Sequence, residues 1–452
     1  MQSNVRALAL NQLREVRRGK KSSLAVDQIL ELRPELSAQD RALVTELIYG
    51  VLRWQGKIDA IIARFSKQNL EKTDPFILDI LRLGVYQLLF LSKIPAYAAI
   101  DESVSLVKNS HEKQASGFVN AILREVQRNR QSFDYRGGDG ANKNLNSAED
   151  IEFETAHPRW LVQKWLTEYG ETTTWDICHS NNTIAPLTLR ANGICCSRDN
   201  LLELIRSEIP DIEAEMTSYA PSGIRLFYRG AVRSLPYFHS GYFQVQDEAS
   251  QLVGPALGVK SGESVLDVCA APGGKSTHLA ELMGDQGEVF ALDKNERRLS
   301  HLRENTQRLG LSSIQSHCED FFKFQTEKQF DRILMDAPCS SLGSLRRCPE
   351  AKWHRTEAQI HEVSKLQIEM LKKGFSHLKP KGTLVYSVCT FTPEETDDVV
   401  QAVCDSNPAC RLESLKHHLP KACGAFIQSN GTFKSLPSAH GMDGFFIARF
   451  TH

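Results

Sequence analysis

The stretch Val265-Leu-Asp-Val-Cys-Ala-Ala-Pro-Gly-Gly-Lys-Ser-Thr277 decides the fold of this chain. A branched apolar run that leads into a Gly-Gly turn predicts a buried parallel strand followed by the N-terminus of a helix. Nucleotide-like cofactors bind at such junctions, because free backbone N–H groups and the helix dipole point at the ligand. The expected cofactor-binding residues of the turn are Cys269, Ala270, Ala271, Pro272, Gly273, Gly274 and Lys275.

Two later motifs each carry a cysteine at the expected end of a strand. They are Asp336-Ala-Pro-Cys339 and Ser387-Val-Cys-Thr390. If their strands belong to the same sheet as the Gly-Gly turn, both cysteines face the same crevice. Such an arrangement suits covalent chemistry beside a bound cofactor.

The region 239–452 alternates between strand-like and helix-like patterns, which predicts an α/β, Rossmann-like domain with a parallel sheet and crossover helices. Residues 445–450 are expected to form a closing strand in an antiparallel hairpin at the edge of the sheet. The other expected strands are 264–269, 288–292, 313–317, 331–336 and 383–389.

The remainder of the chain predicts two further domains. Residues 1–134 show helical periodicity throughout and a capping pattern at Ser37-Ala-Gln-Asp40, so an all-α bundle is expected there. Residues 135–150 are rich in Gly, Asn and Asp, which is typical of a flexible linker. Residues 151–238 mix both patterns, with a short helix near Trp160, and predict a small α+β domain that covers the site or supports the substrate.

Composition places few limits on function. The 452 residues are 41% apolar and 24% charged, as in ordinary globular proteins, and carry a formal net charge of −1. Residues 1–130 contain 20 Lys and Arg against 14 Asp and Glu, a balance of +6 that leaves −7 for the rest. A basic N-terminal third is compatible with an RNA-facing module, although ordinary scatter of charge gives a similar count.

The sequence indicates a cytoplasmic protein with reduced thiols. Neither a signal peptide nor a membrane-spanning segment is expected, because polar residues interrupt the apolar runs. The eleven cysteines form no CxxC pair and have no Cys/His ligand spacing, so neither disulfides nor a metal site is expected.

Two acidic residues fit a nucleoside ligand. Asp293 ends the strand after the Gly-Gly turn, where Rossmann-type sheets present a carboxylate to ribose hydroxyls. Asp320 follows the next strand and would accept a hydrogen bond from an adenine amino group. Either residue alone would more often be a helix cap, but in series with the turn they favour a ligand. Since the turn lacks GxGxxG, S-adenosylmethionine fits better than a dinucleotide.

With these residues, the chain resembles the family of S-adenosylmethionine-dependent RNA cytosine-5 methyltransferases. The resemblance rests on the Gly-Gly turn, on Asp336-Ala-Pro-Cys-Ser340, and on Tyr386-Ser-Val-Cys-Thr390 with Pro393-Glu-Glu395. The N-terminal Leu47-Ile-Tyr-Gly-Val-Leu-Arg-Trp54 resembles the NusB-like RNA-binding domain. A NusB-like domain fused to this methyltransferase is typical of the Sun/Fmu type of 16S ribosomal RNA methyltransferase.

The resemblance covers nearly the whole chain and implies a substrate. That substrate is one cytosine of 16S ribosomal RNA, position 967 in the usual numbering of that RNA, either in naked RNA or in a small-subunit assembly intermediate. A monomer without membrane or metal partners is expected. The chain departs from the family at Ser340-Ser-Leu-Gly343, where Ser-Gly-x-Gly is usual, and at Thr390-Phe391-Thr392, where Ser-Ile commonly follows the cysteine.

The reaction assigns different tasks to the two cysteines. Carbon 5 of cytosine is a poor nucleophile, so a thiolate must first add to carbon 6. The family assigns this attack to the later cysteine, here Cys389, and leaves Cys339 to assist release of the product. The alternative is that both are ordinary buried apolar cysteines.

Four other residues have expected roles around these thiols. Asp336 would hydrogen-bond the cytosine amino group or N3 and is also expected among the cofactor-binding residues. Lys275 would reach the base or the cofactor carboxylate. Arg346 and Arg347 would contact backbone phosphates beside the flipped nucleotide, although paired arginines are usually a solvated surface.

Two other functions compete with this one. Methyltransferases that act on amino groups carry an Asn/Asp-Pro-Pro-aromatic motif, which Ala337-Pro338-Cys339 replaces here. Alternatively, the chain is an RNA-binding ribosome assembly factor with vestigial catalysis. The intact cysteines and acids argue against a loss of methyltransferase activity.

Overall fold

The computed structural model describes residues 4–133, 148–228, 230–407, 410–437 and 440–452. The chain divides into two compact units. The N-terminal unit contains Met1–Thr183 and Leu345–His354, and the C-terminal unit contains Ile184–Ser344 and Arg355–His452. Most of the predicted linker, 135–150, lies outside the described residues.

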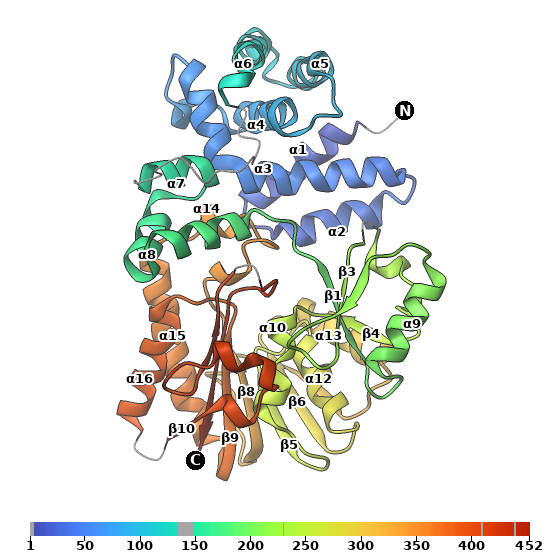
Figure 1. The fold of residues 1–452 in the computed structure, drawn as a ribbon, viewed down its shortest axis with the longest axis vertical. Helices are drawn as coiled ribbons and strands as arrows, with labels where there is room; N and C mark the ends of the chain where they lie inside the picture. The colour runs from blue at the N-terminus through green and yellow to red at the C-terminus, as the bar shows by residue number, and fades with distance from the viewer. Residues whose placement is uncertain (1–3, 134–147, 229, 408–409, 438–439) are drawn as a thin grey trace. The chain divides into compact units, whose positions relative to one another are not determined.

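The first part of the N-terminal unit is helical, as its sequence predicted (Figure 1). Ser37 caps the longest helix, because its hydroxyl accepts a hydrogen bond from the Asp40 N–H at 3.1 Å. Apolar residues at helical spacing pack into one shared core. The helices are α1 Val5–Arg17, α2 Ser22–Leu32, α3 Ala38–Phe65, α4 Pro75–Phe90, α5 Ala96–Lys108 and α6 Ser116–Arg128.

Two further helices, α7 Ala148–Thr155 and α8 Arg159–Asn181, belong to the same unit. The expected short helix near Trp160 is instead a span of 23 residues, interrupted at Gly170 where φ is 75°. The four-part domain division drawn from the sequence stays a prediction, because the two compact units group the chain differently.

The segment Leu345–His354, which includes α14 Ala351–His354, completes the N-terminal unit from far along the chain. The Trp353 indole N–H donates to the Leu52 carbonyl at 2.6 Å, and the Lys352 ammonium donates to the Arg53 carbonyl at 2.8 Å. Glu350 accepts a hydrogen bond at 2.9 Å from the N–H of Ser22, the first residue of α2.

The small sheet of the C-terminal unit is antiparallel, with the order β2-β3-β1-β4. Its apolar residues pack against one helix, which Ser197 caps by accepting from the Asn200 N–H at 3.2 Å. The α+β character predicted for this region is confirmed. The elements are β1 Leu187–Ala191, α9 Arg198–Glu208, β2 Ala214–Met216, β3 Gly223–Leu226 and β4 Phe243–Val245.

The large sheet has the order β10-β12-β9-β8-β5-β6-β7, with β11 also paired to β12. Strands β5 to β9 run parallel, and the five strands predicted for this core are confirmed. The strands are β5 Ser264–Val268, β6 Glu288–Asp293, β7 Ile314–Cys318, β8 Phe330–Asp336, β9 Leu378–Val388, β10 Arg411–Glu413, β11 Phe433–Ser435 and β12 Phe445–Thr451. The α-helices of this region are α10 Glu248–Gln251, α11 Val253–Leu257, α12 Gly274–Leu282, α13 Glu296–Arg308, α15 Glu357–Ser376 and α16 Asp397–Ser406.

Alternate residues of these strands enter two separate cores. On β5, Leu266 packs in the core that α15 and α16 supply, whereas Val265 packs in the core that α10 to α12 supply. Helices therefore cover both faces of the parallel sheet (Figure 1). This three-layer arrangement leaves the ends of the strands as the place for a site.

The expectation for residues 445–450 was only partly right. These residues form β12, which is antiparallel to β9 as predicted. The strand is not at the edge, however, because β10 pairs with its other side. The predicted antiparallel hairpin is formed with β11, the preceding strand in the chain, and not with β9.

Candidate active site

The C-terminal ends of three adjacent strands carry the three motifs. β5 leads into the Gly-Gly turn, β8 ends at Asp336, and β9 ends just before Cys389. β8 lies between the other two, and Asp336 is paired with Ser387 of β9. The chain passes from β5 to β6 on one side and later to β8 on the other, so the strand ends of β5 and β8 form a topological switch point.

The Gly-Gly turn has the shape that a close-fitting ligand loop requires. Gly273 has φ of 100°, and a Cβ atom built on it would lie 2.8 Å from Leu302 Cγ, so only glycine fits there. A Cβ on Gly274 would meet no heavy atom within 4 Å, so open space adjoins the first turn of α12. Free N–H groups at this helix start are suited to bind the anionic end of a ligand.

Arg190 of β1 anchors α12 from the small sheet. Its side chain is 0% exposed and donates from Nε and Nη2 to the two oxygens of Glu281, at 3.0 and 2.7 Å. It also donates to the Gly274 carbonyl at 2.5 Å. Sequence reasoning missed Arg190, because its partners on α12 lie more than eighty residues away and nothing in its own strand marks it.

The two predicted nucleoside-binding acids lie at the ends of neighbouring strands. Asp293 is 4% exposed, and its carboxylate accepts hydrogen bonds from the Ala271 N–H at 3.2 Å and the Asn295 N–H at 2.9 Å. Asp320 is partly exposed and accepts from the Phe322 N–H at 2.9 Å. Asp293 thus also supports the cofactor loop, whereas Asp320 makes a local turn contact.

A third acid, Asp267, lies beneath the loop and was not predicted. The Ser276 hydroxyl donates to its Oδ2 at 2.6 Å, and its buried Oδ1 has no partner. Burial raises the pKa of Asp267 to about 7. Burial also raises the pKa of Cys269 to about 12, with further contributions from Asp293 and Asp336. Crowded carboxylates fit a cationic ligand, and S-adenosylmethionine carries a sulfonium and an ammonium.

Lys275 and Asp336 form an ion pair beside the thiols. Lys275 Nζ lies 2.8 Å from Asp336 Oδ2, and the Ser387 hydroxyl donates to Asp336 Oδ1 at 2.7 Å. Burial alone would lower the pKa of Lys275, but the Asp336 carboxylate outweighs burial and the pKa is raised. The structure therefore brings both predicted residues together as a charged pair.

The two predicted cysteines face each other across the ends of β8 and β9. Their Sγ atoms are 3.2 Å apart. The hydrogen bond from Cys339 lowers the pKa of Cys389 to about 7, against the opposing effect of burial. The same hydrogen bond, together with burial, raises the pKa of Cys339 well above its usual value. The geometry thus favours a thiolate at Cys389 and a neutral thiol at Cys339.

Buried polar groups hold the two cysteine turns together. The Glu395 carboxylate accepts from the Ser340 N–H at 2.7 Å, and the Gln367 amide donates to the Pro338 carbonyl at 2.8 Å. The Gly343 N–H donates to the Cys389 carbonyl at 3.0 Å. Glu395 belonged to the motif that indicated the family, but its position behind the Cys339 turn was not predicted.

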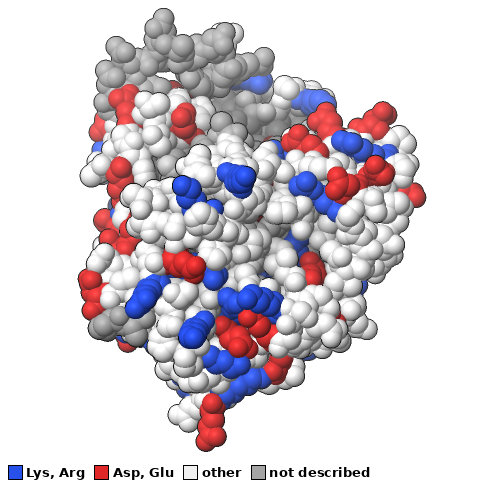
Figure 2. Space-filling view, turned by 60° about the horizontal axis from the view of Figure 1, so that its bottom comes forward, with Lys and Arg blue, Asp and Glu red and all other residues white. Residues whose placement is uncertain are grey.

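Arg346 and Arg347 belong to the segment Leu345–His354 of the N-terminal unit, whereas both cysteines belong to the C-terminal unit. Arg346 is 5% exposed and Arg347 is partly exposed, so Arg347 is the better placed of the two to meet an RNA phosphate. Figure 2 shows Lys and Arg mixed with Asp and Glu over the described residues of one face. Charge on that face therefore does not mark a path for RNA.

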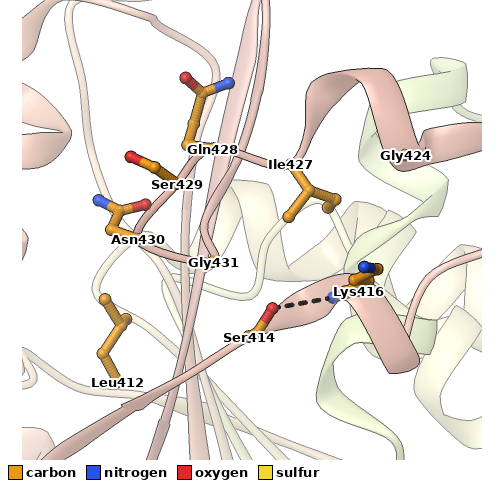
Figure 3. Close-up of a pocket in the computed structure, with 9 residues that line it drawn as sticks. All are labelled: Leu412, Ser414, Lys416, Gly424, Ile427, Gln428, Ser429, Asn430 and Gly431. Carbon is orange, nitrogen blue, oxygen red and sulfur yellow. Dashed lines mark hydrogen bonds between the residues drawn. The ribbon is translucent and has the colours of Figure 1, made fainter.

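A pocket of about 430 Å³ lies elsewhere in the C-terminal unit (Figure 3). Amide, hydroxyl and backbone groups form much of its wall, and Lys416 is the charged residue in it. The motif residues do not line this pocket, so we assign no reaction to it. Its lining residues are Leu412, Ser414, Lys416, Gly424, Ile427, Gln428, Ser429, Asn430 and Gly431.

Two negative findings apply to the described residues alone. His, Cys, Asp and Glu side chains do not gather there in groups of three or more that would hold a metal ion. Within the same residues, every helix is too short or too polar to cross a bilayer.

Family models match three successive parts of the chain. A model described as 16S rRNA methyltransferase RsmB/F matches residues 255–451. The NusB family model matches 3–128, and a model of the ferredoxin-like domain of RsmF/B-like methyltransferases matches 157–233. These matches confirm the NusB-like helical domain, the small α+β domain and the methyltransferase domain.

Individual proteins are similar over much longer spans. The probable ribosomal RNA small subunit methyltransferase B of Bacillus subtilis is 36% identical over 451 residues, 98% of each chain. That of Pseudomonas syringae pv. tomato is 35% identical over 92% of this chain and 90% of its own. The solved structure of PH0851 covers 100% of both chains with a TM-score of 0.83 at 24% identity. A methyltransferase homolog from Pyrococcus horikoshii covers 68% of this chain and 99% of its own, with a TM-score of 0.58 at 29% identity. The chain therefore belongs to the ribosomal RNA small subunit methyltransferase B family.

Proposed function

We propose that this protein methylates carbon 5 of one cytosine in 16S ribosomal RNA, with S-adenosylmethionine as the methyl donor and a covalent bond between Cys389 and carbon 6. The observation that carries the proposal is the pair of thiols 3.2 Å apart, of which Cys389 is the more acidic, beside a cofactor loop. Transfer to an amino group would need no thiolate. A site without catalytic function would not require a thiol of lowered pKa.

The residues of the crevice fit the cofactor. When bound, S-adenosylmethionine supplies an electrophilic methyl group. The Gly-Gly turn with the start of α12 would hold its amino acid end, and Asp293 and Asp320 would hold the nucleoside. The carboxylates around Cys269 suit its positive charges.

Cys389 would act first on the base. Its thiolate adds to carbon 6, and the electrons of the C5–C6 double bond make carbon 5 nucleophilic. Asp336 would orient the base by accepting a hydrogen bond from its amino group, and Lys275 holds that carboxylate in place through the ion pair. Lys275 also places a positive charge near the attacking sulfur.

Cys339 would act after the methyl group has moved. The proton on carbon 5 then passes to a solvent water, the C5–C6 double bond re-forms, and the bond to Cys389 breaks with its electron pair on sulfur. Cys339 lies within 3.2 Å of the departing sulfur and returns a hydrogen bond to it as it leaves. That hydrogen bond stabilises the thiolate as a leaving group.

RNA recognition would fall to the helical domain, which matches the NusB family. Its balance of +6 over residues 1–130 would attract RNA, and Arg347 would contact a phosphate. We place the reaction in the cytoplasm, on position 967 as the family resemblance implies, with the protein acting as a monomer on naked RNA or an assembling subunit.

Tritium release tests the proposed reaction directly. With 16S ribosomal RNA that carries 5-tritiated cytosine, one equivalent of tritium should enter water for each methyl group transferred. Methylation of an amino group would retain the tritium at carbon 5. Methyl incorporation without tritium release would therefore contradict the proposal, as would the absence of both.

Asp293→Ala should weaken binding of S-adenosylmethionine far more than binding of RNA. A charge-assisted hydrogen bond to a ribose hydroxyl contributes about 1.5–3 kcal/mol, so calorimetry should show a roughly ten- to hundredfold loss. Asp285→Ala is a matched control, because Asp285 also accepts backbone N–H bonds, from Ser312 and Ser313, but lies before β6. An unchanged dissociation constant would remove Asp293 from the site.

A further inference from the structure

Ser341 occupies a position whose backbone favours glycine. Its φ is 63°, in the left-handed region that residues with a Cβ seldom adopt. The resemblance described for the sequence implies glycine here, in a Ser-Gly-x-Gly turn. The turn itself is kept, because the Ser344 N–H donates to the Ser341 carbonyl at 3.1 Å. A serine that strains this backbone needs a compensating contact.

The Ser341 side chain reaches both reactive thiols. The Cys389 thiol donates to Ser341 Oγ at 3.6 Å, and Cys339 Sγ lies 4.0 Å from the same oxygen. No glycine at this position would make either contact. The residue with the left-handed backbone is thus in contact with Cys389 Sγ.

We propose that Ser341 is a further catalytic residue, whose hydroxyl donates a hydrogen bond to the Cys389 thiolate and keeps it ready to attack. The proposal rests on the proposed function, in which Cys389 adds to carbon 6. In the thiol state Cys389 is the donor and Ser341 Oγ the acceptor. When Cys389 releases its proton to solvent, the hydroxyl turns its own proton toward the sulfur, so the contact persists with its direction reversed.

Other groups that face Cys389 also change the pKa of its thiol. Cys339, from the same turn as Ser341, and Lys275, from α12, favour the thiolate. Asp336, at the end of β8, and burial itself disfavour it. The hydrogen bond with Ser341 also lowers the pKa of Cys389. Loss of this hydrogen bond should therefore raise the pKa of Cys389 and decrease the fraction of thiolate near neutral pH.

The variant Ser341→Gly separates the catalytic role of the serine from a structural one. Glycine relieves the backbone strain, so the melting temperature should rise or stay level. The pH midpoint for alkylation of Cys389 by iodoacetamide, followed on the Cys389 peptide by mass spectrometry, should move up by about half a unit to one unit. The pH profile of kcat/KM for methyl transfer should shift in the same direction.

Two other variants serve as controls. Ser341→Ala removes the hydroxyl but keeps the strain, so it should shift the alkylation midpoint without the gain in melting temperature. Lys381→Gly relieves a similar φ of 62° at an exposed residue away from the thiols, and should leave the alkylation profile unchanged.

Unchanged alkylation midpoints in both Ser341 variants would overturn the proposal, and so would a shifted midpoint with an unchanged kcat/KM profile. Alkylation needs neither RNA nor cofactor, so it reports the contact independently of the reaction. Failure of the proposed function would show separately, as methyl transfer by a protein that lacks the Cys389 thiol.

Discussion

Cys389→Ala is expected to abolish methyl transfer and to leave S-adenosylmethionine binding nearly unchanged. Without this thiol the site retains only Cys339, whose pKa burial raises, so addition to carbon 6 is lost and carbon 5 stays a poor nucleophile. The rate of tritiated methyl incorporation into 16S ribosomal RNA should fall by about three orders of magnitude or more. Calorimetry with the cofactor should give a dissociation constant within a few-fold of that of the unmodified protein.

A third cysteine gives the control for this substitution. Cys404 is partly buried on α16, and Cys404→Ala removes a thiol of similar exposure that takes no part in the site. It should retain full activity. Substantial turnover by Cys389→Ala would show that the nucleophile has been assigned to the wrong residue.

Cys339→Ala should instead trap the enzyme on its RNA. Cys389 is intact in this variant, so the bond to carbon 6 forms and the methyl group moves. Release then lacks the hydrogen bond that Cys339 Sγ provides at 3.2 Å from the departing sulfur. The product should be a protein–RNA species that is retarded on a denaturing gel and is removed by ribonuclease.

The trapping experiment distinguishes the two possible assignments of the thiols. The double variant, which lacks both cysteines, should give no retarded band. A band from Cys389→Ala and none from Cys339→Ala would reverse the two roles and leave the reaction class intact. Alkylation of the Cys339 thiol should also be slower than that of Cys389 near neutral pH, because the pKa of Cys339 is raised and that of Cys389 is lowered.

The strands and the cofactor turn were predictable because their signals are local. An apolar run that ends in Gly-Gly predicts a buried strand and a helix start without reference to residues elsewhere in the chain. Cys339 and Cys389 were predictable for the same reason, since each follows a strand of the same parallel sheet. The position of β12 inside the sheet was not, because edge and interior strands with apolar residues look alike in sequence.

Other parts of the site depend on partners far apart in the chain. Arg190 pairs with Glu281, which is ninety-one positions away in the sequence, and no local sequence pattern predicts this contact. Ser341 looked like a minor departure from the family, because its left-handed φ and its distance from Cys389 belong to the folded turn. Asp267 lay within the quoted motif, but its unpartnered Oδ1 is visible only in three dimensions.

The place of Leu345–His354 in the N-terminal unit has a consequence for the order of events during protein synthesis. Lys21, which precedes α2, makes no side-chain capping bond, and Glu350 supplies the acceptor for the Ser22 N–H instead. Ser22 and Glu350 are 328 positions apart, so a nascent chain holds α2 without this acceptor until Glu350 has left the ribosome. Domains that follow the usual N-terminal-first order are finished early. Here the N-terminal unit lacks one of its segments until Leu345–His354 has been translated, so its final packing depends on residues that follow Cys339 in the chain.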